Sequence, residues 1–253
     1  MRHFLTILGH EVRMLLVNPS TYLAAVLFLA VMGFVFTALL DSFSTNVQES
    51  SPAFMFFQNY PIPVLFMVPL LTMRCLAEER RLGTIETLLT TPVSTTEVVL
   101  GKYFAAYLLY LSLWASTAGF FYLLNRFAGD AHLLDAGPLL GGYAFVAVSG
   151  LLFIATGVLA SAISRNQAIA GILGFAMLFA LLIGLQYLHQ MSFLQGENLQ
   201  GFRAFLEAAR IDTHFRDFCR GIIDTRQILF YLSGSALMLI LSILSVEAKL
   251  LHS

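Results

Sequence analysis

Residues 78–93, EERRLGTIETLLTTPV, form a charged segment inside a very hydrophobic sequence. Five charged side chains lie within nine positions, and long apolar runs precede and follow them. A helical arrangement places the apolar side chains on one face and the polar ones opposite. The apolar face consists of Leu82, Ile85, Leu88 and Leu89. Pro92 ends such a helix, because the residue before a proline disfavours the α conformation. The pattern predicts a short amphipathic helix, over about 78–91, that lies across the end of a membrane bundle and faces a soluble partner.

The composition of the whole chain indicates a membrane protein. Its 253 residues are 58% hydrophobic and 11% charged, and the mean hydropathy is +0.80. An average soluble domain carries about 25% charged residues. The net charge of −1 argues against a nucleic-acid-binding protein, which would show a basic patch. We therefore expect an all-α polytopic membrane protein, with residues 1–253 forming a single transmembrane domain.

Apolar stretches long enough to cross about 30 Å of hydrocarbon recur six times along the chain. They cover residues 21–40, 61–77, 95–124, 138–163, 168–188 and 228–246. Pro69 is expected to kink the second span, and the capping-box sequence from Ser94 to Glu97 begins the third. The amphipathic residues 2–17 predict a helix that lies in the membrane interface, and Asn18-Pro19 ends it.

Residues 190–226 differ from the spans because they carry five arginines and five acidic residues. Within them, Ile211, Phe215, Phe218 and Ile222 follow a helical spacing, which predicts an extracytoplasmic helix over 211–224. Its residues are candidates for a gate or for a partner surface, and a lid that shields the bundle is an equal alternative. The candidate residues are His214, Phe215, Phe218, Arg220 and Asp224.

The distribution of basic residues predicts the orientation. Six spans place both termini on one side, and that side together with residues 78–93 carries eight Lys and Arg residues against six on the other. The positive-inside rule then predicts cytoplasmic termini and a cytoplasmic 78–93 segment. Cys75 and Cys219 lie on opposite sides in this topology and cannot pair with each other.

Three separated segments carry a resemblance to a known family. The run LLTMRCLAEERRLGTIETLLTTPVSTTEVVLGKY at 70–103 resembles the signature of ABC-2 type permeases, the membrane subunits of one class of ABC exporters. HEVRMLLVNPSTYL at 10–23 is similar to the family's elbow helix followed by its first span. THFRDFCRGIIDTRQILFYLS at 213–233 resembles the segment entering the last span in the gliding-motility-associated branch. The resemblance covers nearly the whole chain in order.

The resemblance implies a fold with six spans, an elbow helix at 2–17 and a coupling helix after the second span. The coupling helix would seat in a cleft of a separate ABC ATP-binding subunit. Positions that carry the motif are Glu78, Glu79, Arg80, Gly83, Thr84, Glu86, Leu88, Leu89 and Pro92. The coupling site would also include Arg81, Leu82 and Ile85, and the two arginines stand where the family often has a lysine.

The resemblance also implies the partners and the location. We expect a homodimer, or a heterodimer with a second permease, bound to two copies of the ATP-binding subunit, which would hold ATP and Mg. No cofactor is expected in this chain itself. An extracytoplasmic auxiliary protein is a further candidate partner. The expected location is the bacterial inner (cytoplasmic) membrane, with multiple passes through the lipid bilayer.

The residues themselves argue against catalysis by this chain. Gly101-Lys102 lacks the upstream glycine-rich turn of a phosphate-binding loop and is followed by Tyr103, so ATP hydrolysis is assigned to a partner. An intramembrane protease with a Glu-Glu pair would need an arginine at position 83, which is glycine here. The apolar face opposite the charges favours a coupling helix at 78–91 over an ordinary solvated loop.

The spans suggest what the protein could move. Aromatic side chains from Tyr103 to Trp114, followed by Thr117, line one face of span three; we interpret them as helix packing, with a pathway or dimer interface as the alternative. The spans hold almost no ionisable residue, which disfavours an ion-coupled carrier. The candidate functions are an exporter permease for an apolar or lipid-linked substrate, a mechanotransmitter that drives an extracytoplasmic assembly without transport, and, third, a membrane protease.

Overall fold

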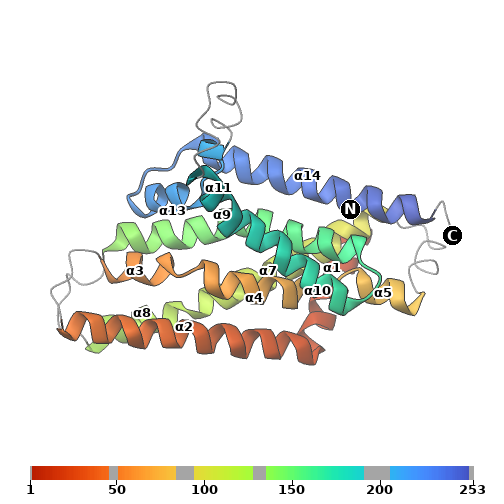
Figure 1. Ribbon diagram of the computed structural model, residues 1–253. Coiled ribbons are helices and arrows are strands. Elements are labelled where there is room, and N and C mark those ends of the chain that lie inside the picture. The colour runs from red at the N-terminus through yellow and green to blue at the C-terminus, as the bar shows by residue number, and fades with distance from the viewer. Residues whose placement is uncertain (1, 46–50, 84–93, 128–134, 191–205, 251–253) are drawn as a thin grey trace, which may run out of the picture.

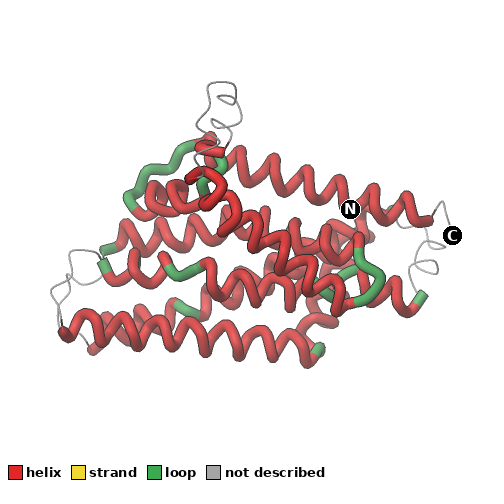
Figure 2. The backbone as a smooth tube through the Cα atoms, viewed as in Figure 1, coloured by secondary structure: helices red, strands yellow, loops and turns green. Residues whose placement is uncertain are grey.

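The computed structural model describes residues 2–45, 51–83, 94–127, 135–190 and 206–250. In these ranges the chain is helical and contains no strand (Figures 1 and 2). The helices are α1 (Arg2–Val17), α2 (Pro19–Thr45), α3 (Pro52–Gln58), α4 (Pro61–Thr72), α5 (Ala77–Leu82), α7 (Thr95–Ser116), α8 (Ala118–Phe127), α9 (Ala136–Ile163), α10 (Gln167–Phe179), the π-helix η2 (Ala180–Gly184), α11 (Leu185–Gln190), α13 (Ile211–Cys219) and α14 (Thr225–Leu250).

Within the described part of the chain, six helical stretches are long and apolar enough to cross a membrane, which confirms the predicted all-α polytopic fold. They are Pro19–Phe43, Pro61–Glu79, Thr95–Arg126, Ala136–Ile163, Gln167–Leu188 and Thr225–Ala248. Both termini and α5 lie at one end of the bundle, which we call the α5 end (Figure 1). The opposite end carries α3 and α13, and we call it the α3 end.

Three spans are less regular than their sequences predict. α4 ends at Thr72, and a turn over residues 73–76 separates it from α5. The third span bends between α7 and α8 at Thr117, whose hydroxyl donates to the Trp114 carbonyl at 2.6 Å. Such a bond to the preceding turn of the same helix bends helices. The fifth span contains the π-helical turn η2, in which one extra residue is accommodated.

The most buried span is α9, which packs against α3, α4, α7, α10, α13 and α14. Its glycines allow this close packing, because no side chain fits where the neighbours lie. A Cβ atom on Gly150 would lie 2.3 Å from Cε1 of Tyr110 on α7, and one on Gly157 would lie 2.3 Å from Oγ1 of Thr72 on α4. Small residues of this kind let helices approach closely in lipid.

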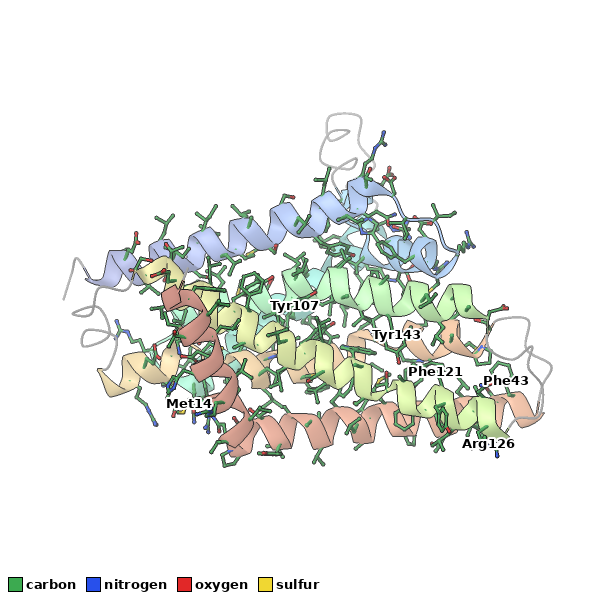
Figure 3. All side chains as sticks on the ribbon, turned by 180° about the vertical axis from the view of Figure 1, so that it is seen from behind. Met14, Phe43, Tyr107, Phe121, Arg126 and Tyr143 are labelled. Carbon is green, nitrogen blue, oxygen red and sulfur yellow. The ribbon has the colours of Figure 1, made fainter. Side chains whose placement is uncertain are left out.

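The aromatic face of α7 packs against α9, which confirms the packing interpretation. Tyr103, Tyr107 and Tyr110 donate their hydroxyl protons to carbonyl oxygens of α9 over 3.1, 2.8 and 3.3 Å. The rings of Tyr103 and Tyr107 stack at 6.2 Å, and those of Tyr107 and Tyr110 at 6.4 Å. Each buried hydroxyl therefore has a partner, and Figure 3 shows Tyr107 inside the bundle.

The first helix runs across the bundle instead of along it. In Figure 3, α1 crosses the α5 end, and Met14 lies near its junction with α2. The inner face of α1 packs on α7, where the rings of Phe4 and Phe104 meet edge to face at 6.0 Å. Leu5, Met14 and Val17 remain exposed on the outer face. This pattern agrees with the expected interfacial helix at 2–17.

The helix predicted over 211–224 is shorter than expected. It is α13, and it ends at Cys219 because Gly221 adopts a φ of +77°. Ile211, Phe215 and Phe218 are buried against the bundle as the helical spacing predicts. Ile222 lies beyond the end of the helix and is 57% exposed, so its assignment to the helix was wrong.

Candidate functional site

Ser161 of α9 holds the junction between α4 and α5. Pro69 lies in the last turns of α4, and the chain leaves the helix after Thr72. The Ser161 hydroxyl oxygen accepts hydrogen bonds from the backbone N–H groups of Leu76 and Ala77, both at 3.0 Å. The same hydroxyl donates to the Met73 carbonyl at 3.3 Å. One side chain thereby satisfies backbone groups on both sides of the turn and fixes the place where α5 begins.

Lys102 is buried at the point where α1, α5 and α7 meet. Its Nζ lies 2.7 Å from Oε1 of Glu11 on α1 and 2.7 Å from Oε1 of Glu79 on α5. The lysine is 5% exposed, and the two glutamates are 17% and 20% exposed. An ammonium group has three donors and can serve two carboxylates at once. We call Glu11, Glu79 and Lys102 the charge cluster.

The residue before Lys102 explains how α1 comes close enough for this contact. A Cβ atom on Gly101 would lie 2.7 Å from Cγ2 of Ile7, so glycine lets α1 lie directly on α7. The Gly101-Lys102 pair therefore has a structural role, which fits its lack of the phosphate-loop pattern.

A second polar contact links the α1–α2 junction to the turn before α5. Arg74 donates from Nη1 to Oδ1 of Asn18 at 2.6 Å. Its Nε lies 3.8 Å from Oε2 of Glu78, and Nη2 of Arg81 lies 4.0 Å from Oε1 of that same Glu78. Asn18 also accepts from the backbone N–H of Ser20 at 3.2 Å, so it caps α2 while it binds Arg74. These partly exposed ion pairs orient side chains more than they stabilise the fold.

This geometry is a short charged helix after the second span, fastened to three other elements at one end of a six-span bundle. Residues 5–248 match the family model described as ABC-2 family transporter protein. The chain belongs to this family. A search of curated proteins finds no relative of significant similarity. As an ABC-2 family transporter protein, the chain is the membrane-embedded permease subunit of an ABC transporter. The ABC-2 permease family works with a separate ABC ATP-binding subunit.

The structure describes only part of the predicted coupling site of this ABC-2 permease. Glu78, Glu79, Arg80, Arg81 and Leu82 lie in α5, and Gly83 follows it. The remaining predicted residues lie outside the described part of the chain: Thr84, Ile85, Glu86, Leu88, Leu89 and Pro92.

The described part of the helix predicted over 78–91 ends before a glycine. α5 ends at Leu82, and Gly83 has a φ of +70°, a left-handed conformation that favours glycine. The described helix also begins one residue earlier than predicted, at Ala77, because Ser161 accepts the Ala77 N–H. Of the predicted apolar face, Leu82 lies in α5 with the charged residues, and Ile85, Leu88 and Leu89 lie outside the described residues.

The residues of the other predicted site, at the α3 end of the permease, differ in exposure: three are buried and two are exposed. His214, Phe215 and Phe218 are 6%, 1% and 1% exposed, so they face the bundle and do not form an open surface. Burial lowers the pKa of His214, and its Nδ1 lies 3.1 Å from the Tyr231 hydroxyl on α14. This hydrogen-bonded histidine joins α13 to α14.

Arg220 and Asp224 are exposed at the turn that follows α13. Asp224 accepts the Arg226 backbone N–H at 2.9 Å and thereby caps α14. These two residues remain available for contacts outside the bundle.

The sequence patterns did not identify the residues that hold α5 in place, namely Glu11, Arg74, Lys102 and Ser161. A signal existed for Lys102, because a lysine near the start of an apolar span needs an anionic partner. No comparable signal marks Ser161, since serines occur in several spans and most hydrogen-bond within their own helix.

Ser161→Ala is expected to destabilise the permease by about 1–3 kcal/mol, because two buried backbone N–H groups lose their acceptor. Ser149→Ala is a matched control on the same helix. Ser149 is equally buried, but within the described residues its hydroxyl donates only to the Val146 carbonyl of α9, at a long 3.5 Å. Thermal unfolding of the purified variants measures the difference. A Ser161→Ala midpoint equal to that of Ser149→Ala would contradict the role of Ser161.

Proposed function

We propose that this permease belongs to an ATP-driven exporter and that α5, with the residues after it, receives motion from the ATP-binding subunit. The fastening of α5 carries this proposal. Within the described residues, α5 is joined to α1 and α7 through the charge cluster, and Ser161 of α9 holds its start. A displacement of α5 must therefore move these helices or break buried polar contacts. Breaking such contacts costs several kcal/mol, so moving the helices is the easier response.

The proposed orientation places the α5 end in the cytoplasm. This follows from the excess of Lys and Arg on that side and agrees with a partner that hydrolyses cytoplasmic ATP. We propose two permease chains, identical or different, and two ATP-binding subunits that hold ATP and Mg. When the two ATP-binding subunits close, each α5 moves its second and third spans as levers. The location in this proposal is the bacterial inner (cytoplasmic) membrane, with both termini inside.

A second candidate, a mechanotransmitter that drives an extracytoplasmic assembly, has one observation in its favour. α9, whose Ser161 holds α5 at one end, packs against α13 at the other end, and α13 is joined to α14 by the His214–Tyr231 contact. Motion of α9 would thus reach the α3 end without any transported substrate. Membership of the gliding-motility-associated branch would agree with this candidate. A large auxiliary protein that co-purifies with the complex would favour it over export.

Gly83→Val is expected to abolish stimulation of the ATP-binding subunit while the chain still inserts in the membrane. A β-branched residue at a φ of +70° costs about 1–3 kcal/mol, so the backbone after α5 must change direction. A Cβ atom on Gly83 meets no atom within 4 Å, so the effect comes from the backbone alone. Glu86→Ala is expected to have the same effect on coupling.

Gly221→Val is the matched control, because Gly221 has a φ of +77° and equally open surroundings at the other end of the bundle. The measurement is the ATPase activity of the purified complex in lipid. Unchanged stimulation in Gly83→Val, or equal losses in both variants, would refute the role of residues 78–91 in coupling. A chain that binds no ATP-binding subunit would refute the proposed function itself.

A further inference from the structure

The turn that joins α13 to α14 holds two isoleucines outside the bundle. Ile222 is 57% exposed and Ile223 is 60% exposed. The turn is closed by two backbone hydrogen bonds, from Gly221 N–H to the Phe218 carbonyl at 3.0 Å and from Ile222 N–H to the Asp217 carbonyl at 2.9 Å. With Gly221 in the left-handed region, these bonds form a Schellman motif. Such motifs usually bring the residue at the Ile222 position back onto the helix, and here it points away.

Both sides of the turn are fastened, so the isoleucines keep this position. The Asp224 carboxylate caps α14 by accepting the Arg226 N–H at 2.9 Å. The Gln227 side-chain amide of α14 donates to Oδ2 of Asp217 on α13 at 2.8 Å. Exposure of an isoleucine pair to water is unfavourable, because the transfer of apolar surface out of water lowers the free energy. A partner that covers the pair is therefore expected.

The position of the turn identifies this partner as the bilayer. The last candidate span begins at Thr225, directly after the turn. Leu229 and Leu232 on the first turns of this span are 62% and 46% exposed, so exposed apolar side chains continue from the turn onto the span. In Figure 1 the connection from α13 to α14 lies at the edge of the molecule, beyond the end of α14.

The charges of the turn fit the headgroup layer of a bilayer. Arg220 and Arg226 flank the isoleucines and are both exposed. Within the described residues neither arginine has an ion-pair partner, whereas Arg216 on α13 pairs with Asp212 at 3.2 Å. A guanidinium group binds phosphate through two parallel hydrogen bonds. Its aliphatic stem can lie along the acyl chains while the charge stays at the interface.

We propose that residues 220–226 form a membrane anchor that binds the phospholipids of the leaflet at the α3 end. Ile222 and Ile223 enter the upper acyl region, and Arg220 and Arg226 bind lipid phosphates. The anchor fixes the end of α13, which packs on α9, at a constant depth in the membrane. The anchored turn stays at this depth while other helices of the bundle move. The inference depends on α14 crossing the membrane and is independent of the proposed coupling at α5.

The test is the fluorescence of an Ile223→Trp variant reconstituted in vesicles of phosphatidylglycerol and phosphatidylcholine. The only natural tryptophan, Trp114, is 1% exposed and gives a constant background that the wild type measures. We expect phospholipids brominated near the glycerol backbone to quench most of the added emission. Lipids brominated near the chain ends and aqueous iodide should quench little of it. Leu229→Trp is the positive control and should respond to the deeper bromines.

Arg220→Gln/Arg226→Gln in the Ile223→Trp protein tests the arginines. Loss of the shallow quenching, with a gain in quenching by iodide, supports phosphate binding. Unchanged quenching would overturn the role of the arginines. Quenching of Ile223→Trp by iodide alone would show a turn in water, and protection from every quencher would show a turn covered by protein. Either of these two results would overturn the membrane anchor, and neither would affect the coupling proposed for α5.

Discussion

Replacing Lys102 with methionine is expected to destabilise the protein by about 3–5 kcal/mol, because two carboxylates lose their shared cation. Methionine fills much of the volume of the lysine side chain but carries no charge. The Nζ atom that it removes lies 2.7 Å from both Glu11 and Glu79, in a site where the lysine is 5% exposed. The thermal unfolding midpoint of the purified chain should fall by several degrees. The fraction that remains monodisperse after heating should fall with it.

Neutral variants of the charge cluster separate electrostatics from packing. Glu11→Gln and Glu79→Gln each leave one carboxylate with Lys102, so each should lower stability only slightly. The triple variant Glu11→Gln/Glu79→Gln/Lys102→Met has no buried charge, and its stability should return toward that of the wild type. It should still fail to stimulate the ATP-binding subunit, because α5 has lost its ionic connection to α1 and α7. A Lys102→Met protein as stable as the wild type would contradict this account of the cluster.

The sequence predicts the parts of this fold that depend on local patterns. Apolar length alone identifies the spans, and Asn18-Pro19 marks the junction where Asn18 caps α2. The capping box at the start of α7 forms as its residues indicate, since Ser94 accepts the Glu97 N–H at 3.2 Å and Glu97 accepts the Ser94 N–H at 3.3 Å. In each of these places, neighbours within a few positions decide the structure.

The contacts that fasten α5 are not local and could not be predicted in the same way. Glu11 and Lys102 lie 91 positions apart in the chain, and Ser161 lies 85 positions from Leu76. Neither spacing has a pattern, because helix packing alone brings these residues together. The sequence identifies the charged segment as the place where a partner would act. It does not show which helices would respond.

Two of the three predicted amphipathic helices, over 78–91 and 211–224, include a glycine before which the described helix ends. Apolar periodicity continued through Gly83 and through Gly221, and both residues adopt positive φ in the structure. Glycine at the end of a helix is itself a stop signal. At the end of α13 this stop signal is present in the sequence, because Arg220 and Gly221 directly follow Cys219, the last residue of the helix. Apolar periodicity does not register this stop signal, so the helix predicted over 211–224 was too long.

Replacing Gly141 with alanine is expected to displace α13 from α9. The new Cβ atom would lie 2.0 Å from the Phe218 carbonyl oxygen and 3.0 Å from Cα of Cys219. Both are backbone atoms, so no side-chain rotation can relieve the contact. Overpacking of this kind costs about 1–3 kcal/mol. Because helix α9 is fixed by its other neighbours, α13 is the element that must move.

The rate at which a maleimide labels the Cys219 thiol measures this displacement of α13. Cys219 is 3% exposed, and burial raises the pKa of its thiol to about 12. A maleimide reacts with the thiolate, so the native thiol should remain unlabelled at pH 8 and become reactive only as the pH approaches 12. Once α13 moves outward, the pKa of the thiol should fall toward its ordinary value of about 8.5. Labelling at pH 8 should then rise by roughly a thousandfold from ionisation alone.

Gly137→Ala is the matched control for this experiment, in a Cys75→Ala background that leaves Cys219 as the single cysteine. Gly137 lies one helical turn earlier on α9, and a Cβ atom there meets no atom within 4 Å. Alanine also favours the helix, so the control should fold as well as the parent. Equal labelling of the two variants would show that the close contact of Gly141 with Phe218 and Cys219 does not fix α13 on α9. Motion of α9 could then not reach residues 211–219, and the mechanotransmitter candidate would lose the packing contact on which it depends.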